Sequence, residues 1–182
     1  FLKDVIAQHV EDGHRRLIGI LMAPHQSKVS WDLPLAGVHD ALAALPEKSR
    51  PIVDVLEPWW GHAGFVGAIA DLVRIAAKEW GEQRLQKAAL VFTAHSIPAA
   101  VADKGPYLAQ IRETAALAAR ALGREAHDIA FQSGVKDSAT PWVGPEVSDH
   151  LRALAKSGVK DVVVAPIGFV CDHVEVLYDL DI

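Results

Sequence analysis

Short continuous runs of apolar residues alternate along this chain with longer segments of helical character. Continuous runs are typical of strands in a parallel sheet, because helices cover both faces of such a sheet and neither face meets water. The longer segments carry apolar residues three and four positions apart, or are rich in alanine and leucine, which favours helices. The predicted strands are Arg16 to Ala23, Ile52 to Leu56, Ala88 to Ala94, Asp128 to Gln132 and Asp161 to Ile167.

Helical segments separate the predicted strands, among them Phe1 to Asp12, Ala63 to Trp80 and Tyr107 to Leu122. Repeated strand–helix units form right-handed crossovers and place successive strands parallel to one another. The sequence therefore predicts an α/β fold, an open parallel sheet flanked by helices on both faces and built from βα repeats. A chain of this length fits one domain, since domains usually span roughly 100–200 residues. We expect a single domain over residues 1–182.

Composition excludes several classes of protein. The formal net charge of -5 lacks the basic excess that binding to a phosphate backbone requires, so we expect no nucleic acid partner. Cys171 is the only cysteine, which rules out an iron–sulfur cluster or a four-thiolate site within this chain and indicates a cytoplasmic protein. No run reaches the ~18 apolar residues of a membrane span. The non-methionine start and acidic end suggest a piece of a longer protein.

Candidate chemistry lies beyond the carboxyl ends of the predicted strands, where open parallel sheets bind ligands. His95 follows the third strand and precedes Pro98, while Asp172, Glu175 and Asp179 follow the fifth strand at helical spacing. A histidine at such a position is more often structural, and three carboxylates on one helix face are more often solvated. Against this, a carboxylate cluster at the carboxyl end of a strand can hold a cation or relay protons.

A tryptophan between prolines offers a further candidate. Trp142 lies within Pro141 to Pro145 and follows a polar stretch that begins at Ser133. It could form the wall of a pocket for a flat ligand, or it could pack in the core. No glycine-rich dinucleotide motif and no P-loop lysine motif is present, so the sequence does not support nucleotide binding.

Three of these segments resemble segments of ferrochelatases, in the order that the family has them. Phe92 to Pro98 resembles their Phe-Ser-Ala-His-Ser-Leu-Pro, and Pro141 to Pro145 matches their Pro-Trp-x-Gly-Pro. Pro166 to Asp181 resembles their Pro-Ile-Gly-Phe-Val-Ser-Asp-His-Val-Glu-Val-Leu-Tyr-Asp-Leu-Asp, with Cys171 in place of serine. The resemblance is dense from about Ala88 to Ile182 and looser before that.

The resemblance implies an enzyme that inserts ferrous iron into a porphyrin, protoporphyrin IX or coproporphyrin III, in haem biosynthesis. Porphyrin and Fe(II) are then substrates, and no tightly bound cofactor is expected. His95 and Glu175 match the family's catalytic pair, which faces the porphyrin. By the same resemblance the metal ligands are His95, Glu175 and Asp179, and the substrate contacts are Trp142, Ser133 and His173.

The resemblance also implies that this chain is the C-terminal half of a two-domain enzyme. The N-terminal half would complete the cleft, so the fragment alone is expected to be inactive, and peripheral association with a membrane stays open. One alternative is a cobalt or nickel chelatase acting on sirohydrochlorin. Another is a non-catalytic haem- or metal-binding module in which His25, His62 and His95 converge.

Overall fold

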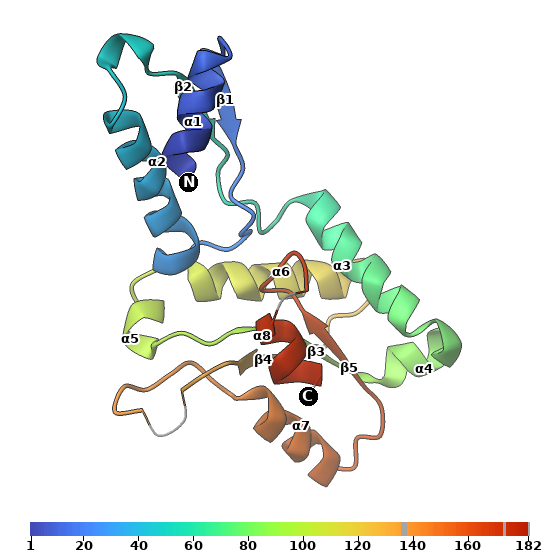
Figure 1. Ribbon diagram of the computed structural model, residues 1–182. Helices are drawn as coiled ribbons and strands as arrows, with labels where there is room; N and C mark the ends of the chain where they lie inside the picture. Colours follow the sequence, from blue (N-terminus) through green and yellow to red (C-terminus); the bar gives the residue numbers. More distant parts are fainter. Residues whose placement is uncertain (136–137, 173, 182) are drawn as a thin grey trace. The chain divides into compact units, whose positions relative to one another are not determined.

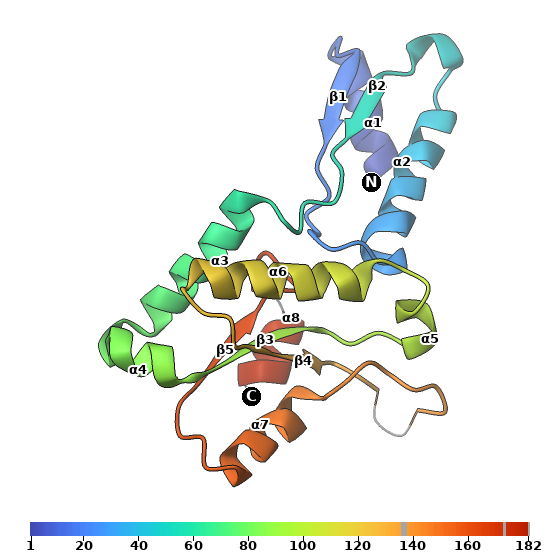
Figure 2. The same cartoon turned by 180° about the vertical axis from the view of Figure 1, so that it is seen from behind.

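A computed structural model describes residues 1–135, 138–172 and 174–181, except for the side chains of Asp179 and Asp181. The chain divides into two compact units, Phe1–Trp59 and Trp60–Ile182. Parallel strands alternate with helices in each unit, which confirms the α/β class (Figures 1 and 2). The described strands form two sheets instead of one, because an apolar run predicts a buried strand but not its hydrogen-bonded neighbour.

The first unit is built around a pair of parallel strands. Its elements are α1 (Leu2–Glu11), β1 (Arg16–Gly19), a π-helical turn (Lys28–Asp32), α2 (Leu33–Ala43), a 3-10 turn (Glu47–Ser49) and β2 (Ile52–Val55). Ile18 on β1 is 71% exposed and Ile52 on β2 is 61% exposed. The prediction that both faces of these strands are buried is therefore wrong. Figures 1 and 2 show α1 on one side of this sheet, and no described element of the unit covers the other side.

The second unit contains a three-stranded parallel sheet in the order β4-β3-β5, with β3 in the centre. Helices cover both faces of this sheet, α3 and α6 on one and α7 and α8 on the other (Figures 1 and 2). Its elements are α3 (Ala63–Ala76), a 3-10 turn (Lys78–Trp80), α4 (Glu82–Lys87), β3 (Ala89–His95), α5 (Ala99–Ala102), α6 (Tyr107–Ala121), β4 (Asp128–Gln132), α7 (Val147–Lys156), β5 (Val162–Pro166), α8 (Val174–Val176) and a π-helical turn (Leu177–Asp181).

Side chains of β3 alternate between two cores, as the geometry of a strand requires. Phe92 and Ala94 pack in the larger core with residues of α3 and α6. Val91 points to the opposite face and packs with Ala130 of β4 and Val147 of α7. Burial on both faces explains the continuous apolar pattern of this strand, which is confirmed here.

Glycines in the left-handed conformation end the two long helices before β4 and β5. Gly123 follows α6 with a φ of 72°, and Gly158 follows α7 with a φ of 93°. Both occupy the position where a helix commonly ends in this conformation. In the part of the chain that the structure describes, no helix is long and apolar enough to cross a membrane.

Candidate active site

The order of the strands brings two of the predicted residues together. His95 is the last residue of β3, and Glu175 lies on α8, which follows the neighbouring strand β5. Parallel neighbours have their carboxyl ends at the same edge of the sheet. The Nε2 atom of His95 lies 3.4 Å from the Oε2 atom of Glu175, and the side chains are 31% and 46% exposed. Both groups are therefore close to each other and open to a ligand.

The imidazole of His95 is oriented by the backbone of the next residue. Its Nδ1 atom is hydrogen bonded to the carbonyl oxygen of Ser96. A carbonyl oxygen only accepts, so Nδ1 must carry the proton, and in the neutral ring Nε2 then keeps its lone pair. The ring of Phe169 meets that of His95 edge to face, with centroids 6.5 Å apart. Nε2, directed toward Glu175, is therefore the atom available to a metal or a proton.

Three further hydrogen bonds brace the chain at His95 and Ser96. The hydroxyl of Tyr107, at the start of α6, donates to the carbonyl oxygen of His95 at 3.0 Å. Burial raises the pKa of Tyr107, so the phenol stays protonated and acts as a donor. The Ser96 hydroxyl donates to the carbonyl of Val143 at 2.7 Å, and its backbone N–H donates to the carbonyl of Gln132 at 2.8 Å.

Two buried polar side chains lie on the strands beneath the pair. Gln132 of β4 is paired in register with His95, so both side chains project from the same face of the sheet. Thr93 lies two residues before His95 and faces the same way. Among the described residues, neither the amide atoms of Gln132 nor the hydroxyl of Thr93 has a hydrogen-bond partner. Buried polar groups normally have partners, so Gln132 is a candidate to contact a ligand or water beside His95.

The segment that carries Trp142 is held beside the segment after His95. Trp142 forms an antiparallel bridge with Pro98, and the N–H of Val143 donates to the carbonyl of Ile97 at 3.0 Å. Trp142 lines a cavity of about 450 Å³ together with Ser96 and Gly134. Within the described residues, the lining of this cavity includes neither His95 nor Glu175.

Of the other predicted contacts, Ser133 lies at the end of β4, half-buried, with a φ of 62°. Its side chain is not part of the cavity lining, although the next residue, Gly134, is. His173 lies outside the described residues. So does the side chain of Asp179, whose backbone belongs to the π-helical turn after α8. The structure therefore brings together His95 and Glu175, and places Trp142 nearby.

The histidines that could form an alternative haem or metal site are engaged elsewhere. His25 belongs to the first unit and is 2% exposed. Burial lowers its pKa to about 4, so it is a neutral core residue near pH 7. His62 caps α3 in the second unit, where its Nδ1 atom accepts a hydrogen bond from the N–H of Gly64 at 3.1 Å. Neither side chain supports the alternative of a binding module with three converging histidines.

Sequence reasoning did not identify Tyr107, Gln132 or Thr93. A polar side chain at the end of an otherwise apolar strand was a signal for Gln132. Thr93 gave no signal, because threonine is common in strands. Tyr107 lies 12 residues after His95, and only the turn between α5 and α6 brings its hydroxyl back to that carbonyl.

The parallel α/β sheet of the second unit carries an imidazole and a carboxylate at the ends of adjacent strands. Such a pair can bind a cation and exchange protons at one site, which is the property of a class of metal-binding α/β proteins. Comparison with known proteins makes this class specific. The family model described as Ferrochelatase matches residues 1–182. This chain belongs to the ferrochelatase family.

Curated relatives cover nearly the whole chain. This chain is 41% identical over 180 residues to a ferrochelatase of Thermus thermophilus, and the aligned region covers 98% of this chain and 55% of that protein. It is 34% identical to a ferrochelatase of Deinococcus radiodurans, over 100% of the chain and 58% of that protein. A coproporphyrin III ferrochelatase of Streptomyces griseus is 35% identical to this chain, and the aligned region covers 100% of this chain and 53% of that protein. The chain thus spans about half the length of these relatives.

Proposed function

We propose that this chain is part of an enzyme that inserts Fe(II) into a porphyrin in haem biosynthesis, with His95 and Glu175 at the reacting atoms. The observation that carries the proposal is the 3.4 Å approach of His95 Nε2 to Glu175 Oε2 at one edge of the parallel sheet. Family membership supports the same reaction. The complete protein performs it, since this chain spans about half of its relatives.

The pair suits the chemistry of metal insertion. Two pyrrole N–H bonds break, two protons leave, and the metal ion becomes bound to the four ring nitrogens. Imidazole exchanges protons near neutral pH, so His95 Nε2 can accept a pyrrole proton. The carboxylate of Glu175 then stabilises the imidazolium ion, and Glu175 in turn is able to pass a proton to solvent, because its side chain is 46% exposed.

The same pair could hold the metal before transfer. Ligand atoms that each lie about 2.0–2.2 Å from a tetrahedral ion are about 3.4 Å apart, which matches the separation between Nε2 and Oε2. A site with one nitrogen and one oxygen from the protein leaves most positions open, so the metal is held weakly enough to move to the four nitrogens of the porphyrin.

The proposal extends to the other candidate residues. Asp179 would be a further metal ligand, while Trp142, Ser133 and His173 would contact the porphyrin. Trp142 is supported by its position on a cavity next to Ser96. The expectations that the enzyme has no tightly bound cofactor, is cytoplasmic, and is completed by an N-terminal half stay predictions.

The substrate can be tested in the complete protein with Zn(II) as a fluorescent reporter of insertion. Coproporphyrin III is expected to be metallated faster than protoporphyrin IX, because several relatives are coproporphyrin III ferrochelatases. Sirohydrochlorin is expected to be a poor substrate. Preference for sirohydrochlorin would assign a different chelatase, and stoichiometric haem binding without insertion would indicate a binding protein.

Tyr107→Phe tests whether the phenol positions His95. The variant loses one hydrogen bond and leaves the carbonyl of His95 without this donor, which usually costs about 1 kcal/mol of stability. We expect kcat for Zn(II) insertion to fall about three- to tenfold with little change in KM for porphyrin, because an ill-placed base affects the chemical step. The exposed Tyr178 provides the matched control, Tyr178→Phe. Loss of stability with unchanged kcat would leave Tyr107 a purely structural residue.

A further inference from the structure

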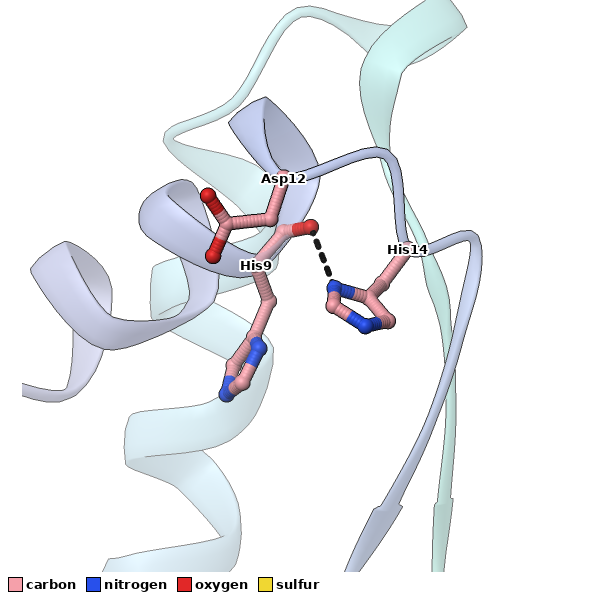
Figure 3. Close-up of side chains that lie close together, drawn as sticks. All are labelled: His9, Asp12 and His14. Carbon is pink, nitrogen blue, oxygen red and sulfur yellow. Dashed lines mark hydrogen bonds between the residues drawn. The ribbon is translucent and has the colours of Figure 1, made fainter.

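A second group of metal-binding side chains lies in the first unit, at the end of α1. His9 is in the last turn of this helix, Asp12 is its C-cap residue and His14 follows after one more residue. One ligand atom from each side chain lies within 4.8 Å of the other two. Figure 3 shows the two imidazole rings near each other at this helix end, with the carboxylate of Asp12 on the other side of His9 from His14. All three side chains are exposed.

The turn at Gly13 creates this arrangement. Gly13 has a φ of 91°, which ends the helix and reverses the chain. The N–H of His14 donates to the carbonyl oxygen of His9 at 2.9 Å, and the N–H of Gly13 donates to the carbonyl oxygen of Val10 at 3.1 Å. This pair of bonds is the Schellman motif. It places His14 over the last turn of α1, so residues five positions apart become neighbours.

Hydrogen bonds already orient two of the three ligands. His14 Nδ1 lies 3.1 Å from the carbonyl oxygen of His9 and must donate to it, which leaves the lone pair on Nε2 (Figure 3). Gln8 donates to one carboxylate oxygen of Asp12 at 3.0 Å and leaves the other oxygen available. Metal-binding histidines typically donate their second ring nitrogen to a carbonyl in this way.

One ligand atom from each side chain already lies within 4.8 Å of the other two, and ligand atoms around one tetrahedral ion lie about 3.4 Å apart. Binding therefore requires the side chains to bring His14 Nε2 toward His9 and Asp12. Exposed side chains can make such a movement by rotation, without disturbing the core. The rings of His9 and His14, with centroids 5.3 Å apart and an interplanar angle of 84°, do not stack and can both turn an edge to a shared ion.

We propose that His9, Asp12 and His14 form a surface site for a divalent transition metal ion of the Zn(II), Co(II) or Fe(II) type. Two imidazole nitrogens and one carboxylate oxygen favour these ions over Ca(II) and Mg(II), which prefer oxygen ligands. The open positions would be filled by water. The proposal does not rest on the function assigned to His95 and Glu175, which belong to the other unit.

The test is titration of the whole chain with Co(II), followed by absorption, and with Zn(II), followed by calorimetry. A His95→Gln background removes the ligand of the other site. In this background we expect one bound ion, and addition of His14→Ala or Asp12→Asn should weaken binding at least about tenfold. His39→Ala is the control, because His39 is an exposed histidine of the same unit.

Both of the site variants can be checked for folding by circular dichroism, and His14→Gln retains a polar side chain if alanine perturbs the turn. Unchanged Co(II) affinity in folded His14→Gln and Asp12→Asn would refute the site, as would an equal loss in His39→Ala. In the complete protein with His95 intact, His14→Gln and Asp12→Asn should leave porphyrin metallation normal, so the outcome for this site is separate from that of the proposed function.

Discussion

Replacement of His95 by glutamine is expected to lower porphyrin metallation by the complete enzyme at least about a hundredfold, within the range that general acid–base catalysis contributes. The amide keeps the size and polarity of the ring but cannot accept a pyrrole proton near neutral pH. The substitution also removes the Nε2 atom of His95, which lies 3.4 Å from the Oε2 atom of Glu175. The measurement is the initial rate of Zn(II) or anaerobic Fe(II) insertion at saturating porphyrin.

His127→Gln is the matched control for this prediction. His127 precedes β4 and so lies at the opposite edge of the same sheet, where its Nδ1 atom is hydrogen bonded to the carbonyl of Glu125. Its replacement should leave the rate close to that of the wild type. Glu175→Gln should reduce the rate as His95→Gln does. If His95→Gln and His127→Gln had the same wild-type rate, His95 could not be the base.

Gly168→Ala is expected to have the second large effect, although residue 168 touches no substrate in this proposal. An added Cβ would lie 3.0 Å from Cα and 3.1 Å from Cβ of Ala94, and 3.4 Å from the backbone nitrogen of His95. Ala94 is fully buried, so the segment after β5 must move instead. That segment leads to Glu175, and displacements of about 1 Å near a reacting group can cost about a hundredfold in rate.

The expected result for Gly168→Ala is a rate lowered about ten- to a hundredfold and a stability lowered by about 1–3 kcal/mol, as for an overpacked core. Gly67→Ala is the control. Apart from its chain neighbours and the nearby backbone of its own helix, no atom lies within 4 Å of the position that a Cβ at residue 67 would take. Gly67 lies within α3, where alanine is favoured over glycine by about 1 kcal/mol. Wild-type activity and melting temperature in Gly168→Ala would show that the segment after β5 adapts freely.

The sequence predicted the second unit better than the first, for a physical reason. The run from Ala88 to Ala94 is apolar on both faces, and β3 is buried on both faces. The runs around Ile18 and Ile52 have the same character but lie on exposed strands. An apolar run shows that burial of the strand is favourable, but it does not show which helix or sheet buries it.

The same difference applies to the candidate site. His95 and Glu175 could be proposed from the sequence because strand ends are recognisable and adjacent parallel strands share an edge. Tyr107 and Gly168 could not, because their importance depends on a close approach between segments distant in the sequence. The cluster of His9, Asp12 and His14 depends similarly on the turn at Gly13, whose backbone conformation glycine permits but does not require.

The different amounts of buried apolar side chain within the two units bear on how the chain unfolds. The main apolar cluster is built entirely from the second unit, whereas the buried apolar side chains of the first unit are few, including Ile6, Trp31, Val38 and Ala41. Chains that contain several compact units commonly depart from cooperative all-or-none unfolding. A single melting temperature would then average two equilibria. Amide exchange within β3 would report the global stability of the second unit, while exchange within β1 would report the smaller free energy that holds the first unit together.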